Sequence, residues 1–77
     1  MTSERRLVER ALDDAVRMAR WRLLGRRTRV SRLYFQLRAE GVGWRRAHAL
    51  TRRTRKAVAG VRKEPAARGV ALDLILA

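Results

Sequence analysis

Apolar residues recur at helical spacing over the first third of the chain. Between positions 3 and 24 they fall three or four residues apart, at Leu7, Val8, Ala11, Leu12, Ala15, Val16, Ala19, Leu23 and Leu24. This spacing gathers them on one face of a helix. All acidic residues of this segment lie at positions 4–14 and only arginines carry charge after them, which complements the helix dipole. With Ser3 or Thr2 as N-cap and Gly25 as the stop, the pattern predicts a long amphipathic helix over residues 1–25.

A second apolar stripe predicts a helix over residues 28–40. Its members are Val30, Leu33, Tyr34 and Leu37. Gly41 ends this helix, and the short linker that follows brings the next segment close by. Tyr34 and Phe35 are neighbours and therefore point to different faces, so we expect one in the core and the other partly exposed.

The segment 44–63 has two interpretations. Its apolar and small residues, Ala47, Leu50, Thr54, Ala57, Val58 and Val61, would line one continuous helix. Alternatively the chain breaks near 51–53 and Thr54 caps a second short helix. Either version ends at Glu64, because the residue before Pro65 avoids the α region.

The last segment, 65–77, is apolar and nearly uncharged. Val70, Leu72, Leu74 and Leu76 alternate as in a strand, yet the same residues fit a short helix. Both alternatives stay open for this segment. The whole pattern predicts a single all-α domain over residues 1–77, a small bundle of three to four helices with a short apolar C-terminal segment.

Charge is concentrated in the middle of the chain. Twenty Lys and Arg oppose seven Asp and Glu, which gives a formal net charge of +13. Residues 41–63 carry eight basic residues and no acidic one, whereas 1–14 and 64–77 are nearly neutral. So much like charge in a small chain indicates a polyanionic partner, and its position indicates that the folded middle binds it.

The residue types that most catalytic and metal sites need are scarce. There is no cysteine, and His48 is the only histidine, so neither thiol chemistry nor a zinc site is expected. No Ser/His/Asp grouping and no glycine-rich phosphate loop occurs, so we expect no enzyme, no cofactor and no small-molecule substrate. Apolar runs are too short to span a bilayer, and the N-terminus lacks an apolar signal core. These features predict a cytoplasmic, nucleoid-associated protein of bacterial or phage type.

The tetrapeptide RRTR occurs at 26–29 and again at 52–55. Each copy would place arginines beside the start of a helix, with Thr28 or Thr54 as the cap. Free backbone N–H groups and arginines would then converge on one phosphate. The competing interpretation is that these arginines simply populate solvated surface in an arginine-rich chain.

Residues 31–64 carry a family resemblance. Leu37-Arg38-Ala39-Glu40-Gly41 ends one helix, Trp44 to Leu50 forms a middle helix, and Thr54 to Lys63 forms a basic helix. This order resembles the helix-turn-helix DNA-binding domain of the homeodomain-like and resolvase type. The resemblance implies a helix-turn-helix within 28–63 and a recognition helix over 54–63 that lies in the DNA major groove.

The expected function is sequence-specific binding of double-stranded DNA, as a transcriptional regulator or a recombination accessory factor that forms a homodimer. The candidate nucleic-acid-binding residues are Arg26, Arg27, Arg29, Arg45, Arg46, Arg52, Arg53, Arg55, Lys56, Arg62 and Lys63. One alternative is an architectural or RNA- or ribosome-associated protein that uses the same arginines. Another is a phage or bacterial protein-interaction module. A membrane-surface helix at 3–24 is disfavoured because its first half is acidic.

Overall fold

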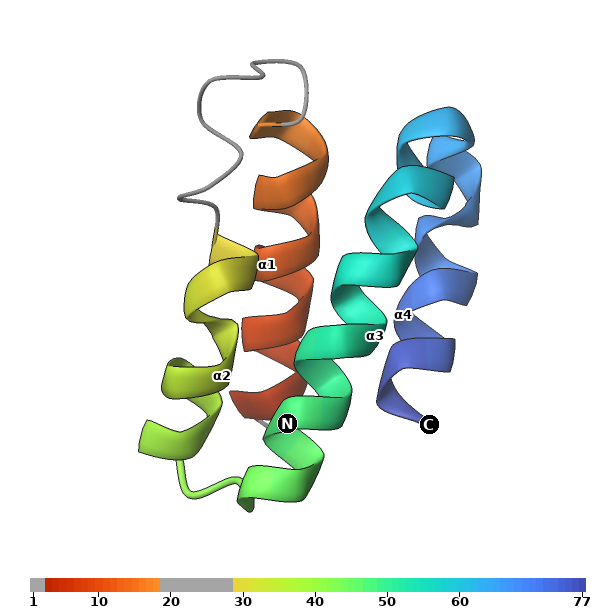
Figure 1. The fold of residues 1–77 in the computed structure, drawn as a ribbon. Coiled ribbons are helices and arrows are strands. Elements are labelled where there is room, and N and C mark those ends of the chain that lie inside the picture. Colours follow the sequence, from red (N-terminus) through yellow and green to blue (C-terminus); the bar gives the residue numbers. More distant parts are fainter. Residues whose placement is uncertain (1–2, 19–28) are drawn as a thin grey trace.

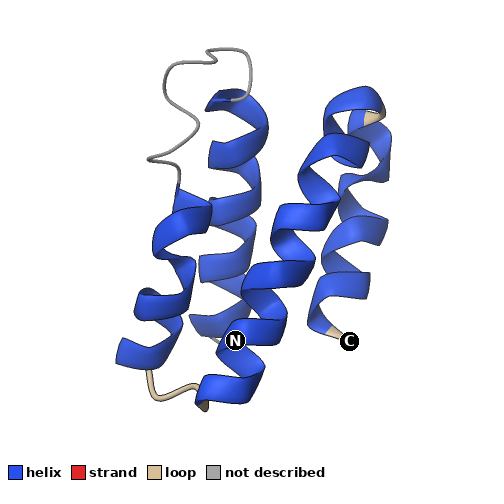
Figure 2. Ribbon diagram, in the orientation of Figure 1, coloured by secondary structure: helices blue, strands red, loops and turns tan. Residues whose placement is uncertain are grey.

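The protein is a bundle of helices, shown in Figure 1 as a computed structural model that describes residues 3–18 and 29–77. The elements are α1 (Ser3–Met18), α2 (Arg29–Ala39), α3 (Trp44–Lys63), a short 3₁₀ helix (Pro65–Ala67) and α4 (Arg68–Leu76). Figure 2 shows no strand among the described residues. The prediction of a small all-α bundle is confirmed.

Successive helices run in opposite directions, and α3 holds the bundle together. Helices α1, α2 and α3 pack against one another, while α4 lies mainly on α3 and touches α1 only lightly. In Figure 1, α3 crosses in front of α1, with α2 on one side and α4 on the other. This position buries one face of α3 and leaves the opposite face in solvent.

The core consists of the apolar stripes that the sequence predicts. Its buried members are Val8, Ala11, Leu12, Ala15, Leu33, Leu37, Ala47, Leu50, Val61, Leu72 and Ile75. Tyr34 packs against this core, whereas Phe35 is exposed, as expected for neighbours on different faces. The predicted helix over 1–25 is present as α1 up to Met18, and its expected end at Gly25 lies outside the described residues.

Helix α3 is continuous over twenty residues. Of the two interpretations of segment 44–63, the continuous helix is confirmed and the break near 51–53 is wrong. The predicted recognition helix 54–63 is the second half of α3. Thr54 is fully buried rather than a cap, and its hydroxyl donates to the Leu50 carbonyl at 2.7 Å. Thr51 bonds to the Ala47 carbonyl in the same way. A threonine whose hydroxyl is satisfied inside the helix can face the core without ending the helix.

A tight turn joins α2 to α3. Gly41 adopts a positive φ of 92°, and its N–H donates to the Arg38 carbonyl at 3.0 Å. The N–H of Val42 donates to the Leu37 carbonyl, also at 3.0 Å, so two carbonyls at the end of α2 are satisfied. Glycine adopts this backbone conformation without strain, which fixes the position of the reversal.

The C-terminal segment is a helix and not a strand. Leu72 and Ile75 lie three residues apart and both point into the core, which is the helical alternative. Strand alternation would instead have placed Leu72 and Leu74 on the same face, yet Leu74 is exposed.

Candidate nucleic-acid interface

Four cations form a straight line along the solvent side of α3. Arg45, Arg52, Lys56 and Lys63 are all exposed and follow one another at intervals of seven, four and seven residues. Such intervals return to nearly the same side of a helix, here the side opposite the buried Ala47, Leu50 and Thr54. We call these four residues the basic ridge. It extends over roughly 27 Å at 1.5 Å per residue.

The arginine that follows each of the first two ridge residues has a different role. Arg46 and Arg53 lie one heptad apart, on the side of α3 that faces α4. Arg46 donates to the Leu76 carbonyl and Arg53 to the Ile75 carbonyl, each at 3.0 Å. These carbonyls lie in the last turn of α4, which has no helical N–H left to bind them. The two arginines therefore cap α4 and complement its dipole.

Arg46 also reaches α1. Its guanidinium forms a two-bond pair with the Glu4 carboxylate, at 2.8 and 2.9 Å. Hydrogen bonding from Arg46 holds the pKa of the Glu4 carboxyl below its usual range, against the opposing effect of burial. The same hydrogen bond raises the pKa of Arg46. One side chain thus ties α1, α3 and α4 together.

A second arginine, at the first residue of α4, joins that end of the helix to α1. Arg68 forms a two-bond pair with Asp13, at 2.6 and 2.9 Å, and also donates to Glu9 at 3.0 Å. The hydrogen bonds that Arg68 donates to Asp13, and then to Glu9, raise the pKa of Arg68. This three-residue ion pair therefore holds the start of α4 against the middle of α1.

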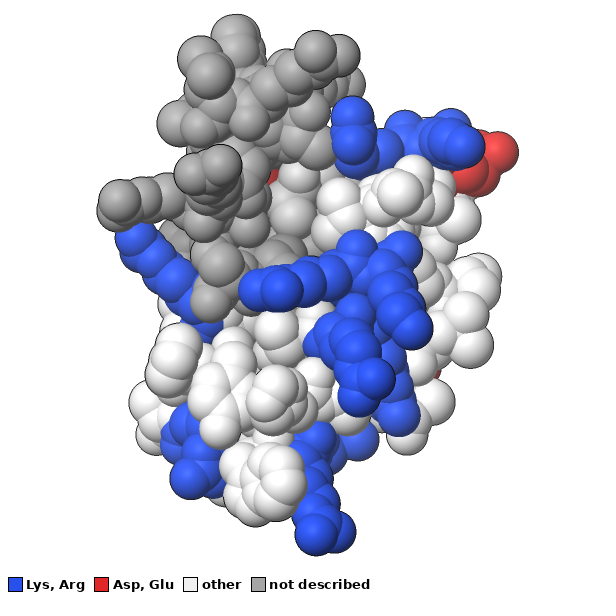
Figure 3. All heavy atoms as spheres, in the orientation of Figure 1, with Lys and Arg blue, Asp and Glu red and all other residues white. Residues whose placement is uncertain are grey.

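These contacts segregate the charge. Five of the seven acidic residues lie within 4.0 Å of an arginine, and the arginines concerned are Arg5, Arg17, Arg46 and Arg68. Among the described residues, no acid lies within that distance of a ridge cation. Figure 3 shows Lys and Arg gathered over α3, with few acidic atoms on the same face. The charge of the ridge is therefore not compensated by an ion pair within the part of the chain that the structure describes.

An aromatic cleft adjoins the ridge on the α2 side. It has a volume of about 430 Å³ and is lined by Tyr34, Phe35, His48, Thr51, Arg52 and Arg55. The rings of Tyr34 and Phe35 meet edge to face, with centroids 5.2 Å apart. The ring of His48 lies tilted against Tyr34 at 5.0 Å. The outer ring, Phe35, is 71% exposed, so one aromatic face is open beside two arginines.

The start of the ridge carries another exposed aromatic residue. Trp44 is 55% exposed, and the Arg45 guanidinium lies over its ring at 5.3 Å from the centroid. This cation–π contact orients Arg45 without neutralising its charge. The first ridge residue is therefore held in place by its neighbour.

The predicted site residues divide into five groups. Arg45, Arg52, Lys56 and Lys63 form the ridge, Arg55 lines the cleft, and Arg62 is exposed in the last turn of α3. Arg46 and Arg53 donate to carbonyl groups at the end of α4. Arg26 and Arg27 lie outside the described residues, as does the side chain of Arg29 at the start of α2.

The second RRTR does not lie at a helix entrance. It falls inside α3, where backbone N–H groups are already bonded to carbonyls four residues earlier. The phosphate clamp predicted at 52–55 is therefore wrong in that form, although Arg52 and Arg55 remain exposed. Most of the first copy, at 26–29, lies outside the described residues.

The sequence interpretation missed the aromatic cleft. The adjacent pair Tyr34-Phe35 was a signal, because one ring of such a pair must face outward. His48 then meets Tyr34 only because α2 and α3 pack side by side, which no local pattern reveals.

No protein-family model, curated protein or solved structure matches this chain. Within residues 3–18 and 29–77, no helix is long and apolar enough to cross a membrane. In the same ranges no group of three His, Cys, Asp or Glu side chains could hold a metal ion.

Proposed function

We propose that this protein binds double-stranded DNA, with α3 lying in the major groove and the basic ridge contacting phosphates. The supporting observation is the segregation of charge described above. The acidic residues that face arginines hold α1 and α4 in place, and the ridge lies apart from them. A chain with a net charge of +13 is best neutralised by a polyanion, whose bound counterions are released on binding.

The shape of α3 suits this partner. An α-helix fits the major groove, and α3 is a twenty-residue helix at the front of the bundle. Arg52, Arg55 and Lys56 lie near its middle and are exposed, so arginine forks could address guanine there. In this proposal Arg45 and Lys63 contact phosphates at the two ends.

A sequence-specific regulator or recombination accessory factor would also need a second copy. One helix contacts few base pairs, and two copies set the spacing of two half-sites. A homodimer therefore belongs to this proposal, and a two-fold symmetric target site would support it.

A second candidate function is binding of single-stranded nucleic acid, as in an RNA-associated protein. It is favoured by one observation, the open face of Phe35 beside Arg52 and Arg55. Bases in a duplex are stacked on one another, so an exposed ring can stack only on a base that is unpaired. The ridge would then follow the phosphates of one strand.

The test is fluorescence anisotropy with a labelled duplex and with its separate strand, measured across a range of salt concentrations. Each ridge–phosphate contact contributes about −0.9 to the log–log salt slope for a duplex. The double variant Arg45→Ala/Lys63→Ala removes the two end contacts and should therefore weaken binding and flatten the slope by roughly two. Arg10→Ala removes an exposed cation from α1 and should change the slope much less.

The outcomes separate the two candidates. Tighter duplex binding, insensitive to Phe35→Ala, supports the major-groove proposal. Tighter single-strand binding that falls with Phe35→Ala supports the second candidate. Equal losses per removed charge for the ridge variant and for Arg10→Ala would contradict both, because binding would then follow net charge alone.

A further inference from the structure

Helix α4 is apolar on both sides. Leu72 and Ile75 are buried in the core, yet Val70 and Leu74 are 63% and 68% exposed on the outer side. The exposed pair is four residues apart, so the two side chains form one ledge. A helix that is apolar all round is normally covered all round. The outer side of α4 therefore suits a partner.

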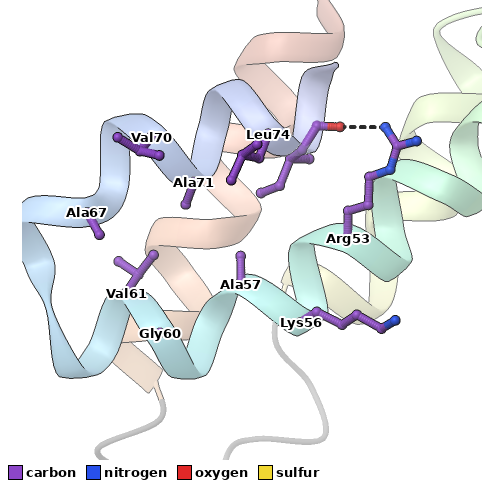
Figure 4. Close-up of a pocket in the computed structure, with 10 residues that line it drawn as sticks. Arg53, Lys56, Ala57, Gly60, Val61, Ala67, Val70, Ala71 and Leu74 are labelled. Atoms are coloured by element: carbon purple, nitrogen blue, oxygen red, sulfur yellow. Dashed lines mark hydrogen bonds between the residues drawn. The ribbon is translucent and has the colours of Figure 1, made fainter.

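The ledge borders a groove between α3 and α4. Figure 4 shows Val70, Ala71 and Leu74 on one wall, with Ala57, Gly60 and Val61 on the other. The hollow has a volume of about 420 Å³, and its lining is almost entirely apolar. It is hollow because its walls carry small residues, and a methyl group added at Gly60 would meet no atom within 4 Å.

Positive charge lines the α3 edge of this groove. Arg53 and Lys56 stand there, and Figure 4 shows Arg53 directed at the end of α4 while Lys56 extends outward. On α4 the one acidic residue is Asp73, which lies 4.0 Å from Arg5 of α1. An occupant of the groove therefore meets apolar walls and a cationic edge.

A second copy of the chain fits this edge poorly. A two-fold interface brings the same patch of both copies together. Arg53 and Lys56 of one copy would then approach those of the other, in a dimer of net charge +26, twice the +13 of one chain. Like charges placed opposite each other disfavour a partner. An acidic occupant has the opposite, complementary charge.

We infer that the α3–α4 groove binds an amphipathic helix of an acidic partner protein. Apolar side chains of that helix, spaced three and four residues apart, would lie on Val70 and Leu74 and in the hollow above Gly60. Its carboxylates would face Lys56 and Arg53. Because Lys56 also belongs to the basic ridge, the partner and a nucleic acid would share one cation.

The probe is a designed helical peptide with leucines along one face and glutamates elsewhere, titrated into ¹⁵N-labelled protein and followed by NMR. We expect the largest shift changes at Ala57, Gly60, Ala71 and Leu74. The double variant Val70→Ser/Leu74→Ser should weaken peptide binding by about tenfold or more, since two exposed aliphatic contacts are lost. Both residues are exposed, so the fold should persist.

Two controls test whether the acidic peptide binds merely because the protein is basic. Phe35→Ser removes an equally exposed apolar residue outside the groove and should leave peptide affinity unchanged. A peptide with serines in place of the leucines should bind weakly and equally to all variants. Shift changes confined to the ridge, or equal affinity for Val70→Ser/Leu74→Ser and wild type, would overturn the inference. So would a dimer in sedimentation that Val70→Ser/Leu74→Ser dissociates, because a second copy would then occupy the groove.

Discussion

At the scale of single residues, neighbouring arginines have different roles. Arg45 and Arg52 belong to the solvent ridge, while Arg46 and Arg53, one position later, cap the end of α4. One position along a helix is a rotation of about 100°, which suffices to turn a side chain from solvent to a neighbouring helix. Composition predicts a basic surface here, but it does not tell which arginine of each adjacent pair faces solvent and which faces α4. That assignment depends on where α4 packs.

The Glu4–Arg46 pair should make stability depend on pH. The pKa of Glu4 is lowered in the folded protein, so the pair's contribution is fully present above the carboxyl's usual pKa of 4.5. It is lost as pH falls through the lowered pKa. Both side chains are partly exposed, so the expected contribution is only about 0.5–1 kcal/mol.

The measurement is chemical denaturation of wild type and Glu4→Gln at pH 7 and again near pH 3. The variant should be less stable at pH 7, and the difference should shrink at low pH. Glu40→Gln is the matched control, because Glu40 is exposed in the α2–α3 turn. A difference that persists unchanged at low pH would show that Glu4 acts through something other than its charge.

At the scale of helices, the sequence predicts most of the fold because apolar spacing is a strong signal over long segments. The ends of the helices and possible breaks within them are harder to predict from the sequence. Thr54 suits an N-cap and a buried helical position equally well, and only packing against the core decides between them. The C-terminal segment was ambiguous for a similar reason, since nine residues are too few for periodicity to distinguish helix from strand.

Two glycines test the continuity of α3 and the turn that precedes it. Gly60 lies inside α3 with open space around it, so Gly60→Ala should stabilise the protein by about 0.5–1 kcal/mol. Gly41 has a φ of 92°, so Gly41→Ala should destabilise it by about 1 kcal/mol. Thermal melts of both variants give the comparison. A loss of stability in Gly60→Ala would argue against a regular helix at that position.

At the scale of the whole molecule, the charge acts against the fold. Residues 3–18 and 29–77 carry sixteen basic and seven acidic side chains, a net charge of +9, and the radius of gyration is 11.6 Å. The Debye length is about 10 Å at 0.1 M salt, so below that concentration most of the cations repel one another across the entire molecule. The basic character of the candidate site could be predicted from the sequence, because the net charge follows from composition alone. The segregation of its acids could not, because it depends on which helices meet.

Salt should therefore raise the melting temperature. Between about 10 mM and 0.5 M sodium chloride we expect an increase of several degrees, as the repulsion is screened. Screening also weakens pairs such as Arg68–Asp13, but exposed pairs contribute about 1 kcal/mol or less each. A melting temperature that falls with salt would mean that the ion pairs outweigh the repulsion.

The ion pairs between distant parts of the chain also bear on how fast the protein folds. Most helices pack against their neighbours in sequence, and such topologies fold in microseconds to milliseconds. The Glu4–Arg46 and Asp13–Arg68 pairs instead close loops of 42 and 55 residues. Closing such long loops costs conformational entropy, so we expect these two pairs to form late in folding, after the helices have packed. Disrupting either pair should then accelerate unfolding by about twofold to fivefold and leave the refolding rate nearly unchanged, so each pair would lengthen the lifetime of the folded state by that factor.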